Sequence, residues 1–214
     1  MSLVSAIRTN SLGLSLFALI TAGAIAVTQV MTRDSIAANR EEAAARALYE
    51  IIPAERIDND LLHDTVTLPR AQQVGSEGPL AIHLARKDDQ VIGVIVPVIA
   101  ADGYTGSIEL IVGIEADGTL AGVRILRHQE TPGLGDKVDL KKSPWVLGFN
   151  GERLQSDDDP GFAVKKDGGR FDQFTGATIT PRAVVGGVKR ALQLFRDNRA
   201  HLLEGSPWEV HRNG

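Results

Sequence analysis

The feature that most constrains this chain is a stretch without charge near its N-terminus, between Arg8 and Arg33. Residues 12–31 are mostly apolar, and a helix of that length crosses a hydrocarbon core of about 30 Å at about 1.5 Å per residue. A cleaved secretory signal is the alternative, because residues 22–24 (Ala-Gly-Ala) imitate a small-residue cleavage site. Apolar character continues past that point through residues 25–31, which favours a retained membrane anchor.

The charges beside this segment bear on its orientation. One arginine, Arg8, precedes the segment, and three follow it at Arg33, Arg40 and Arg46. The positive-inside rule therefore favours a cytoplasmic C-terminal domain. The rule governs short loops, whereas long domains cross largely regardless of charge, so the residues alone leave the orientation open.

The sequence predicts four consecutive parts of the chain. Residues 1–10 form a short tail, 11–32 a transmembrane helix, 33–53 a helical stalk ended by Pro53, and 54–214 a folded domain. Strand-like segments at 82–85, 91–96, 107–114 and 120–126 are joined by turn residues, among them Asp117-Gly118. A helix is expected from Pro181 to about Leu203. The predicted fold class is α+β, with one N-terminal transmembrane helix and a small, mostly antiparallel sheet packed against helices.

Composition excludes several classes of protein. The net charge is −4 and the pI is near 5.7, which leaves no basic surface for nucleic acid. The chain has no cysteine, so it holds no disulfide, thiolate zinc site, iron–sulfur cluster or thioether-linked haem. Its five histidines, at 63, 83, 128, 201 and 211, lack the spacing of metal ligands, and we predict no metal site.

One short segment combines small residues with a helix start. Residues 172–181 read Asp-Gln-Phe-Thr-Gly-Ala-Thr-Ile-Thr-Pro, in which Thr180 is predicted to cap a helix that begins at Pro181. A helix N-terminus offers unpaired N–H groups and partial positive charge, which favour a phosphate. Threonine-rich loops that bind nothing are common, so the segment alone leaves phosphate binding open.

A second segment, residues 128–135, reads His-Gln-Glu-Thr-Pro-Gly-Leu-Gly and follows the predicted Asp117-Gly118 hairpin. Gly133 and Gly135 lack Cβ atoms, so a flat ring or a phosphate could lie against the backbone. A glycine-rich turn without a ligand is the alternative. A dinucleotide fingerprint is excluded, because position 138 is valine and no helix is expected to open there.

These segments carry a family resemblance. Asp-x-x-Thr-Gly-Ala-Thr, here residues 172–178, resembles the flavinylation motif of FMN-binding subunits in two bacterial respiratory complexes. These are the G subunit of the Rnf electron-transport complex and the C subunit of the sodium-pumping NADH:quinone oxidoreductase. The 128–135 octapeptide and the Gly-Tyr-x-Gly segment at 103–106 are similar to the same domains, and the matches lie within residues 100–195.

The resemblance implies that one FMN is joined by a phosphoester to the hydroxyl of Thr178. It places around the flavin the other motif residues, namely Asp172, Thr175, Gly176, Ala177, His128, Glu130, Thr131, Gly133, Leu134, Gly135 and Tyr104. Asp172 is expected to support its loop and Glu130 to orient its loop by hydrogen bonding. No catalytic residue is predicted, because the threonine is an attachment point and the flavin performs the redox chemistry.

For the whole protein, the resemblance implies an electron-carrying subunit of an ion-translocating ferredoxin:NAD oxidoreductase in the bacterial inner membrane. Its FMN domain would lie on the periplasmic side, whereas the positive-inside rule applied to the flanking arginines favours the cytoplasmic side. The implied partners are the other proteins of the complex, membrane lipid and a flavin transferase that uses FAD. Rnf is favoured over the quinone reductase because the chain is short and its motif begins with Thr175, where the other family typically has serine.

Two alternatives of other classes remain at this point. One is a membrane-tethered assembly domain without a redox role. The other is a free-standing flavin reductase, for which the sequence offers no nicotinamide site.

Overall fold

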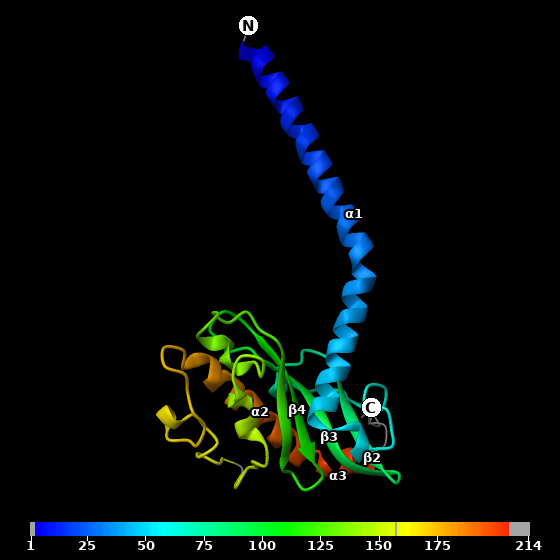
Figure 1. The fold of residues 1–214 in the computed structure, drawn as a ribbon, viewed down its shortest axis with the longest axis vertical. Helices are drawn as coiled ribbons and strands as arrows, with labels where there is room; N and C mark the ends of the chain where they lie inside the picture. The colour runs from blue at the N-terminus through cyan, green and yellow to red at the C-terminus, as the bar shows by residue number, and fades with distance from the viewer. Residues whose placement is uncertain (1–2, 157, 206–214) are drawn as a thin grey trace, which may run out of the picture. The chain divides into compact units, whose positions relative to one another are not determined.

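A computed structural model describes residues 3–156 and 158–205. The ends of the predicted tail and domain, residues 1–2 and 206–214 with His211, lie outside the described residues. The chain divides into two units, Met1–Ala44 and Ala45–Gly214, which are described separately. Figure 1 shows the elements and their labels.

The described residues of the first unit are all helical. Helix α1 (Leu3–Ile51) also continues into the second unit. It includes residues 3–10, where the sequence predicted a tail, because no proline interrupts the chain before Pro53. Its end at Ile51 agrees with the expected stop at that proline.

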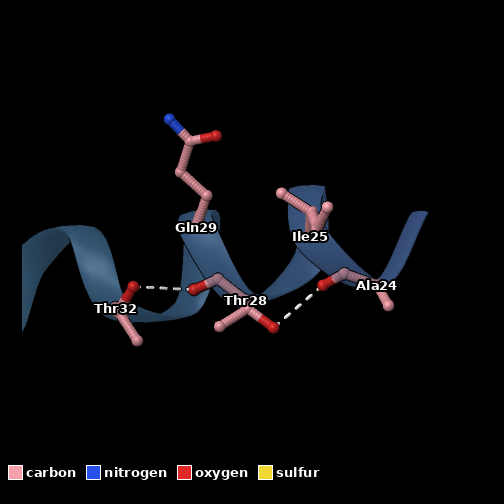
Figure 2. A pocket seen from close by; sticks show the side chains of 5 residues that line it. All are labelled: Ala24, Ile25, Thr28, Gln29 and Thr32. Atoms are coloured by element: carbon pink, nitrogen blue, oxygen red, sulfur yellow. Dashed lines mark hydrogen bonds between the residues drawn. The ribbon is translucent and has the colours of Figure 1, made fainter. Parts of the chain in front are cut away.

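Within α1, Ser11–Arg33 is a 23-residue segment with a mean hydropathy of 1.9, long and apolar enough to cross a membrane. At about 1.5 Å per residue it measures about 34 Å. The hydroxyl of Thr28 donates to the carbonyl of Ala24 (2.8 Å) and that of Thr32 to the carbonyl of Thr28 (2.7 Å), as Figure 2 shows. Because these donors are satisfied inside the helix, the threonines are compatible with apolar surroundings.

The second unit is built on a five-stranded antiparallel sheet in the order β1-β2-β3-β4-β5, which confirms the predicted α+β class. Its strands are β1 (Thr65–Leu68), β2 (Leu80–Lys87), β3 (Gln90–Ala100), β4 (Ile108–Glu115) and β5 (Leu120–Arg127). Strands β2 to β5 overlap the four predicted segments, and only residue 107 of those segments lies outside a strand. The short β1 is not evident in the sequence, because four residues carry little alternation.

Turn chemistry accounts for the hairpins. Asp88 and Asp89 both have positive φ (50° and 62°), as a two-residue hairpin turn requires, and they connect β2 to β3. Gly118 has a φ of 91° in the predicted turn between β4 and β5. The order of the sheet therefore follows from local sequence.

Both faces of the sheet are covered. The end of α1 packs on one face, where Ile51 and Ile52 join Ile95 and Ile111 in one apolar cluster. Helices α2 (Ile179–Asp197) and α3 (Arg199–Glu204) pack on the other face (Figure 1). They replace the single helix that was expected to run from Pro181 to about Leu203, with Asn198 between them.

In the described residues of the segment between β5 and α2 there are three short 3₁₀-helices, η3 (Gly135–Val138), η4 (Pro144–Phe149) and η5 (Lys165–Asp167). Aromatic side chains hold it together: the ring of Phe149 lies 4.6 Å from that of Phe171 and 5.3 Å from that of Trp145, centroid to centroid. These contacts give the long loop a core of its own.

Candidate functional site

Two loops and the start of helix α2 meet at one buried carboxylate, Glu130, which is only 4% exposed. One oxygen, Oε1, accepts from the N–H of Thr105 (3.1 Å), in the loop 103–106, and lies 3.2 Å from the Thr105 hydroxyl, which donates to the carbonyl of Gln129 (2.6 Å). The other, Oε2, accepts from the hydroxyl of Thr180 at the start of α2. Glu130 itself belongs to the segment 128–135 that follows β5. The structure therefore brings together the three segments on which the family resemblance depends.

Two glycines allow this close approach. A Cβ on Gly103 would lie 2.9 Å from Oε1 of Glu130, and one on Gly135 would lie 2.9 Å from Oε2 and 2.7 Å from Oγ1 of Thr180. Contacts this short do not occur for real Cβ atoms. At Gly135 glycine thus allows packing around the carboxylate, and at Gly103 it also avoids the carbonyl of Gly106, which lies 2.2 Å from the Cβ point.

The segment 128–135 is further fixed by its own backbone. The N–H of Glu130 donates to Nδ1 of His128 (3.1 Å), and the N–H of Leu134 donates to the carbonyl of Thr131 (3.1 Å). Gly133 has a φ of 78°, in the region that favours glycine. His128 and Thr131 therefore shape this loop through hydrogen bonds.

The predicted attachment loop forms a tight turn. The N–H of Ala177 donates to the carbonyl of Phe174 (3.1 Å), and Gly176, at the third position of the turn, has a φ of 82°. Phe174 is buried, whereas Thr175 and Gly176 are exposed and Ala177 and Thr178 are half-buried. The turn thus presents its small residues to solvent directly before α2.

The cap of α2 corrects one prediction. Thr180 was expected to cap a helix that begins at Pro181, but α2 begins at Ile179 and its N-cap is Thr178. Thr180 lies inside the first turn and is completely buried. Its hydroxyl has found an acceptor 50 residues away, on Glu130, and local sequence does not reveal such a partner.

The N-terminus of α2 is open to a ligand. The side chain of Thr178 makes no capping hydrogen bond. The N–H groups of Thr178, Ile179 and Thr180 have no acceptor in the part of the chain that the structure describes, and Pro181 has no N–H. Unpaired N–H groups at a helix start attract an anion, and a phosphate on Thr178 would lie next to them.

Large apolar side chains remain exposed in the same loops. Tyr104 is 66% exposed, Leu134 is 41% exposed and Ile179 is 44% exposed. A methyl carbon of Leu134 lies 3.8 Å from the point that a Cβ on Gly176 would occupy, so the segment 128–135 and the attachment loop touch. These side chains provide apolar surface that a flat ring beside Thr178 could cover.

Ion pairs flank the attachment loop. Asp172 pairs with Lys165 (2.6 Å), and Asp167 accepts two bonds from Arg182 on α2 (2.6 and 2.8 Å). The hydrogen bond from Arg182 holds the pKa of Asp167 below its ordinary value. Both ion pairs are exposed and contribute little to stability, so the expected support of the loop by Asp172 stays a prediction.

A buried network anchors the preceding loop. Asp159 is 3% exposed and accepts from the N–H groups of Gly161 (2.9 Å) and Gln155 (3.2 Å) and from Nη1 of Arg170 (3.1 Å). Nε of Arg170 also donates to Glu152 (2.6 Å). Burial by itself raises the pKa of Asp159, but the amide and guanidinium bonds outweigh it and hold the pKa below its ordinary value.

This network predicts a pH dependence of stability. A carboxylate whose pKa is lowered by folding stabilises the protein above its unfolded value, near 3.8, and loses that contribution as pH falls through the folded value. We expect the stability gap between the wild type and Asp159→Asn to be full at neutral pH and to close below about pH 4. Urea unfolding from pH 7 to about pH 2.5 measures it. A difference in unfolding free energy between the two proteins that stays constant from pH 7 to about pH 2.5 would contradict this account.

No group of three or more His, Asp and Glu side chains in residues 3–156 and 158–205 is arranged to hold a metal ion. Nδ1 of His128 accepts the hydrogen bond from the N–H of Glu130, and Nδ1 of His83 lies 2.8 Å from the carbonyl oxygen of Leu61.

Comparison with known proteins identifies the family of this chain. Residues 103–193 match the FMN-binding domain, and residues 1–51 match the RnfG N-terminal region. The G subunit of the ion-translocating oxidoreductase complex of Pseudomonas aeruginosa is 48% identical over 194 residues, 91% of each chain. The same subunit from Pseudoalteromonas atlantica is 45% identical over 200 residues, which cover 94% of this chain and 93% of that protein.

This chain belongs to the RnfG family of ion-translocating oxidoreductase complexes. The Vibrio cholerae RnfG protein is also similar, at 45% identity over 200 residues that cover 94% of this chain and 95% of that one. Family membership confirms the resemblance and the preference for Rnf over the quinone reductase. As a member of the RnfG family, the chain is part of a membrane complex with other subunits.

In this RnfG chain, some site residues were not evident from sequence. Thr105 lies beside the predicted Tyr104, and it is Thr105 that bonds to Glu130 through its N–H and to the carbonyl of Gln129 through its hydroxyl. Trp145 in η4 donates its indole N–H to the carbonyl of Asp172 (2.8 Å). No sequence signal indicated Trp145, because its partner lies 27 residues away in a different loop.

Proposed function

We propose that this chain carries electrons through one FMN joined covalently to Oγ1 of Thr178. The observation that carries the proposal is the open N-terminus of α2, where a hydroxyl that makes no capping bond lies beside unpaired N–H groups. The match of residues 103–193 to the FMN-binding domain supports the identity of the cofactor.

The surroundings favour Thr178 over the two neighbouring threonines. The hydroxyl of Thr180 is buried and donates to Glu130, so it is out of reach of another enzyme. Thr175 is exposed, but it lies in the turn rather than at the helix start. Of the three, Thr178 is the one whose side chain combines partial exposure with the helix N-terminus.

The residues around Thr178 fit the proposed cofactor. Gly176 and Ala177 leave room for the phosphate, and the N–H groups of Ile179 and Thr180 would donate to it. Tyr104 and Leu134 would cover part of the ring. When bound, the flavin supplies one- and two-electron redox chemistry, and these side chains set its position and polarity.

Attachment needs a donor with an activated FMN. With FAD, the Thr178 oxygen forms a bond to the phosphorus of the FMN half, the pyrophosphate bond breaks and AMP leaves. The hydroxyl proton passes to a base of the flavin transferase. The proposal assigns no catalyst for this step to the chain itself, because the Thr178 hydroxyl donates to no base among the residues that the structure describes.

The proposal is tested by purifying the full-length chain after expression with and without a flavin transferase. A denaturing gel separates covalent from dissociable flavin. We expect a fluorescent band only with the transferase, and no NADH oxidation by the flavin-loaded chain on its own. If the chain showed no flavin fluorescence after expression with an active transferase, the proposal would be wrong. The chain would then be a membrane-tethered assembly domain without a redox role.

We further propose that Ser11–Arg33 is a retained anchor in the bacterial inner membrane and that the FMN domain is periplasmic. A covalent bond suits that side, because an exported domain cannot replace a lost flavin from the cytoplasmic pool.

The orientation can be tested by labelling a single introduced cysteine. Because the chain has no cysteine of its own, the reagent has no other thiol in the protein to label. A single cysteine at the exposed Glu77 should react with a membrane-impermeant maleimide on cells whose outer membrane is permeabilised. Labelling only after lysis of the inner membrane would place the domain in the cytoplasm.

A further inference from the structure

Trp145 belongs to none of the three loops that carry the family resemblance, yet its side chain holds the attachment loop. Its indole N–H donates to the carbonyl of Asp172 (2.8 Å). Its ring meets that of Phe174 edge to face, with 5.2 Å between centroids and an interplanar angle of 68°. One side chain therefore contacts both Asp172, where the motif begins, and Phe174, where the turn at 174–177 begins.

Trp145 is itself well anchored. It follows Ser143, whose hydroxyl accepts from the Trp145 N–H (3.2 Å) and caps η4. The indole also packs at right angles against Phe149, which is completely buried. The 3₁₀-helix η4 packs against strand β5. Trp145 thus connects the attachment loop to the sheet.

The other ties on residues 172–177 are weaker. The ion pair of Asp172 with Lys165 is exposed on both sides (69% and 55%), and such pairs contribute little. Gln173 accepts one bond from the backbone N–H of Lys166 (3.1 Å), an exposed residue of η5. The indole bond is also exposed, but its ring packs against the buried Phe149 and Phe174, so Trp145 ties the backbone at Asp172 to the packed core.

We propose that Trp145 is a positioning residue for flavin attachment. By fixing Asp172 and Phe174, it keeps the turn in the one conformation that places the Thr178 hydroxyl at the open N-terminus of α2. This inference rests on the proposed function of Thr178. Without the indole bond the loop populates further conformations, and the transferase binds only the fraction in which the hydroxyl is correctly presented.

The variant Trp145→Phe tests this, because it keeps an aromatic ring against Phe149 and Phe174 and removes the N–H donor. Lys165→Met is the matched control, since it removes the exposed bond to Asp172. Hydrogen exchange is followed on the flavin-free full-length chain in detergent, with attention to the Ala177 amide, which the turn protects. Flavin transfer from FAD is measured at varied carrier concentration.

For Trp145→Phe we expect exchange in 172–178 to rise about fivefold, the factor for one net hydrogen bond, while β3 and β4 exchange as in the wild type. The KM of the transferase for the carrier should rise by a similar factor, with a smaller change in kcat. Lys165→Met should change both by less than about twofold.

Unchanged loop exchange and KM in Trp145→Phe would overturn the proposal. An equal rise of exchange in the loop and the sheet would also overturn it, because Trp145 would then serve only general stability. A wild type that accepts no flavin would refute the proposed function and the attachment role with it. The exchange data would show separately whether the indole holds the loop.

Discussion

The variant Thr178→Ala is expected to abolish covalent flavin while leaving the fold intact. The change removes only the hydroxyl that is to be esterified, and that hydroxyl makes no capping hydrogen bond whose loss would destabilise α2. After expression with the transferase, the full-length variant should give no fluorescent band on a denaturing gel. Its thermal unfolding without flavin should stay within about 0.5 kcal/mol of the wild type.

Two further variants make this result specific. Thr175→Ala removes an exposed hydroxyl from the same loop and should keep the fluorescent band. Thr178→Ser keeps a hydroxyl at the helix start and should retain some attachment. If Thr175→Ala lost the fluorescent band and Thr178→Ala kept it, the flavin would be attached to Thr175 and our assignment of Thr178 would be wrong.

The second large effect is expected at Glu130, where Glu130→Leu should lower the free energy of unfolding by about 3 kcal/mol. Leucine cannot accept a hydrogen bond, so the Thr105 N–H and the buried Thr180 hydroxyl would lose their acceptor. For a unit of this size the change corresponds to a fall in Tm of roughly 6–12 °C. Circular dichroism of the flavin-free chain in detergent measures it.

Glu130→Gln separates hydrogen bonding from packing. The amide has the same size, can still accept from Thr105 through its oxygen, and can donate to the Thr180 oxygen. We expect a cost of about 1 kcal/mol and flavin attachment close to that of the wild type. Equal stability of Glu130→Leu and the wild type would refute the view that this carboxylate joins its own loop to the loop 103–106 and to the start of α2.

The parts of the fold that depend on neighbouring residues could be predicted from sequence. The uncharged segment before Arg33, the stop at Pro53 and the turn at Asp117-Gly118 each act through local chemistry, and the structure contains the corresponding helix and hairpin. Antiparallel order then follows, because short turns join neighbouring strands.

The contacts that assemble the site could not be predicted in this way. Thr180 looked like a helix cap because its local sequence fits one, and only the fold brings the Glu130 carboxylate to its hydroxyl. Trp145 and Asp172 likewise meet only through the packing of η4. Family resemblance named the segments, whereas the hydrogen bonds that join them are long-range in sequence.

The most direct test of the central claim is to locate the flavin in the wild-type chain. Protein purified from membranes after expression with the transferase is digested, and the fluorescent peptide is fragmented in a mass spectrometer. We predict a single peptide that carries the mass of FMN less one water, with the fragments placing it on Thr178. A flavin phosphate on Thr175 or Thr180, or flavin that leaves the denatured protein intact, would contradict the account.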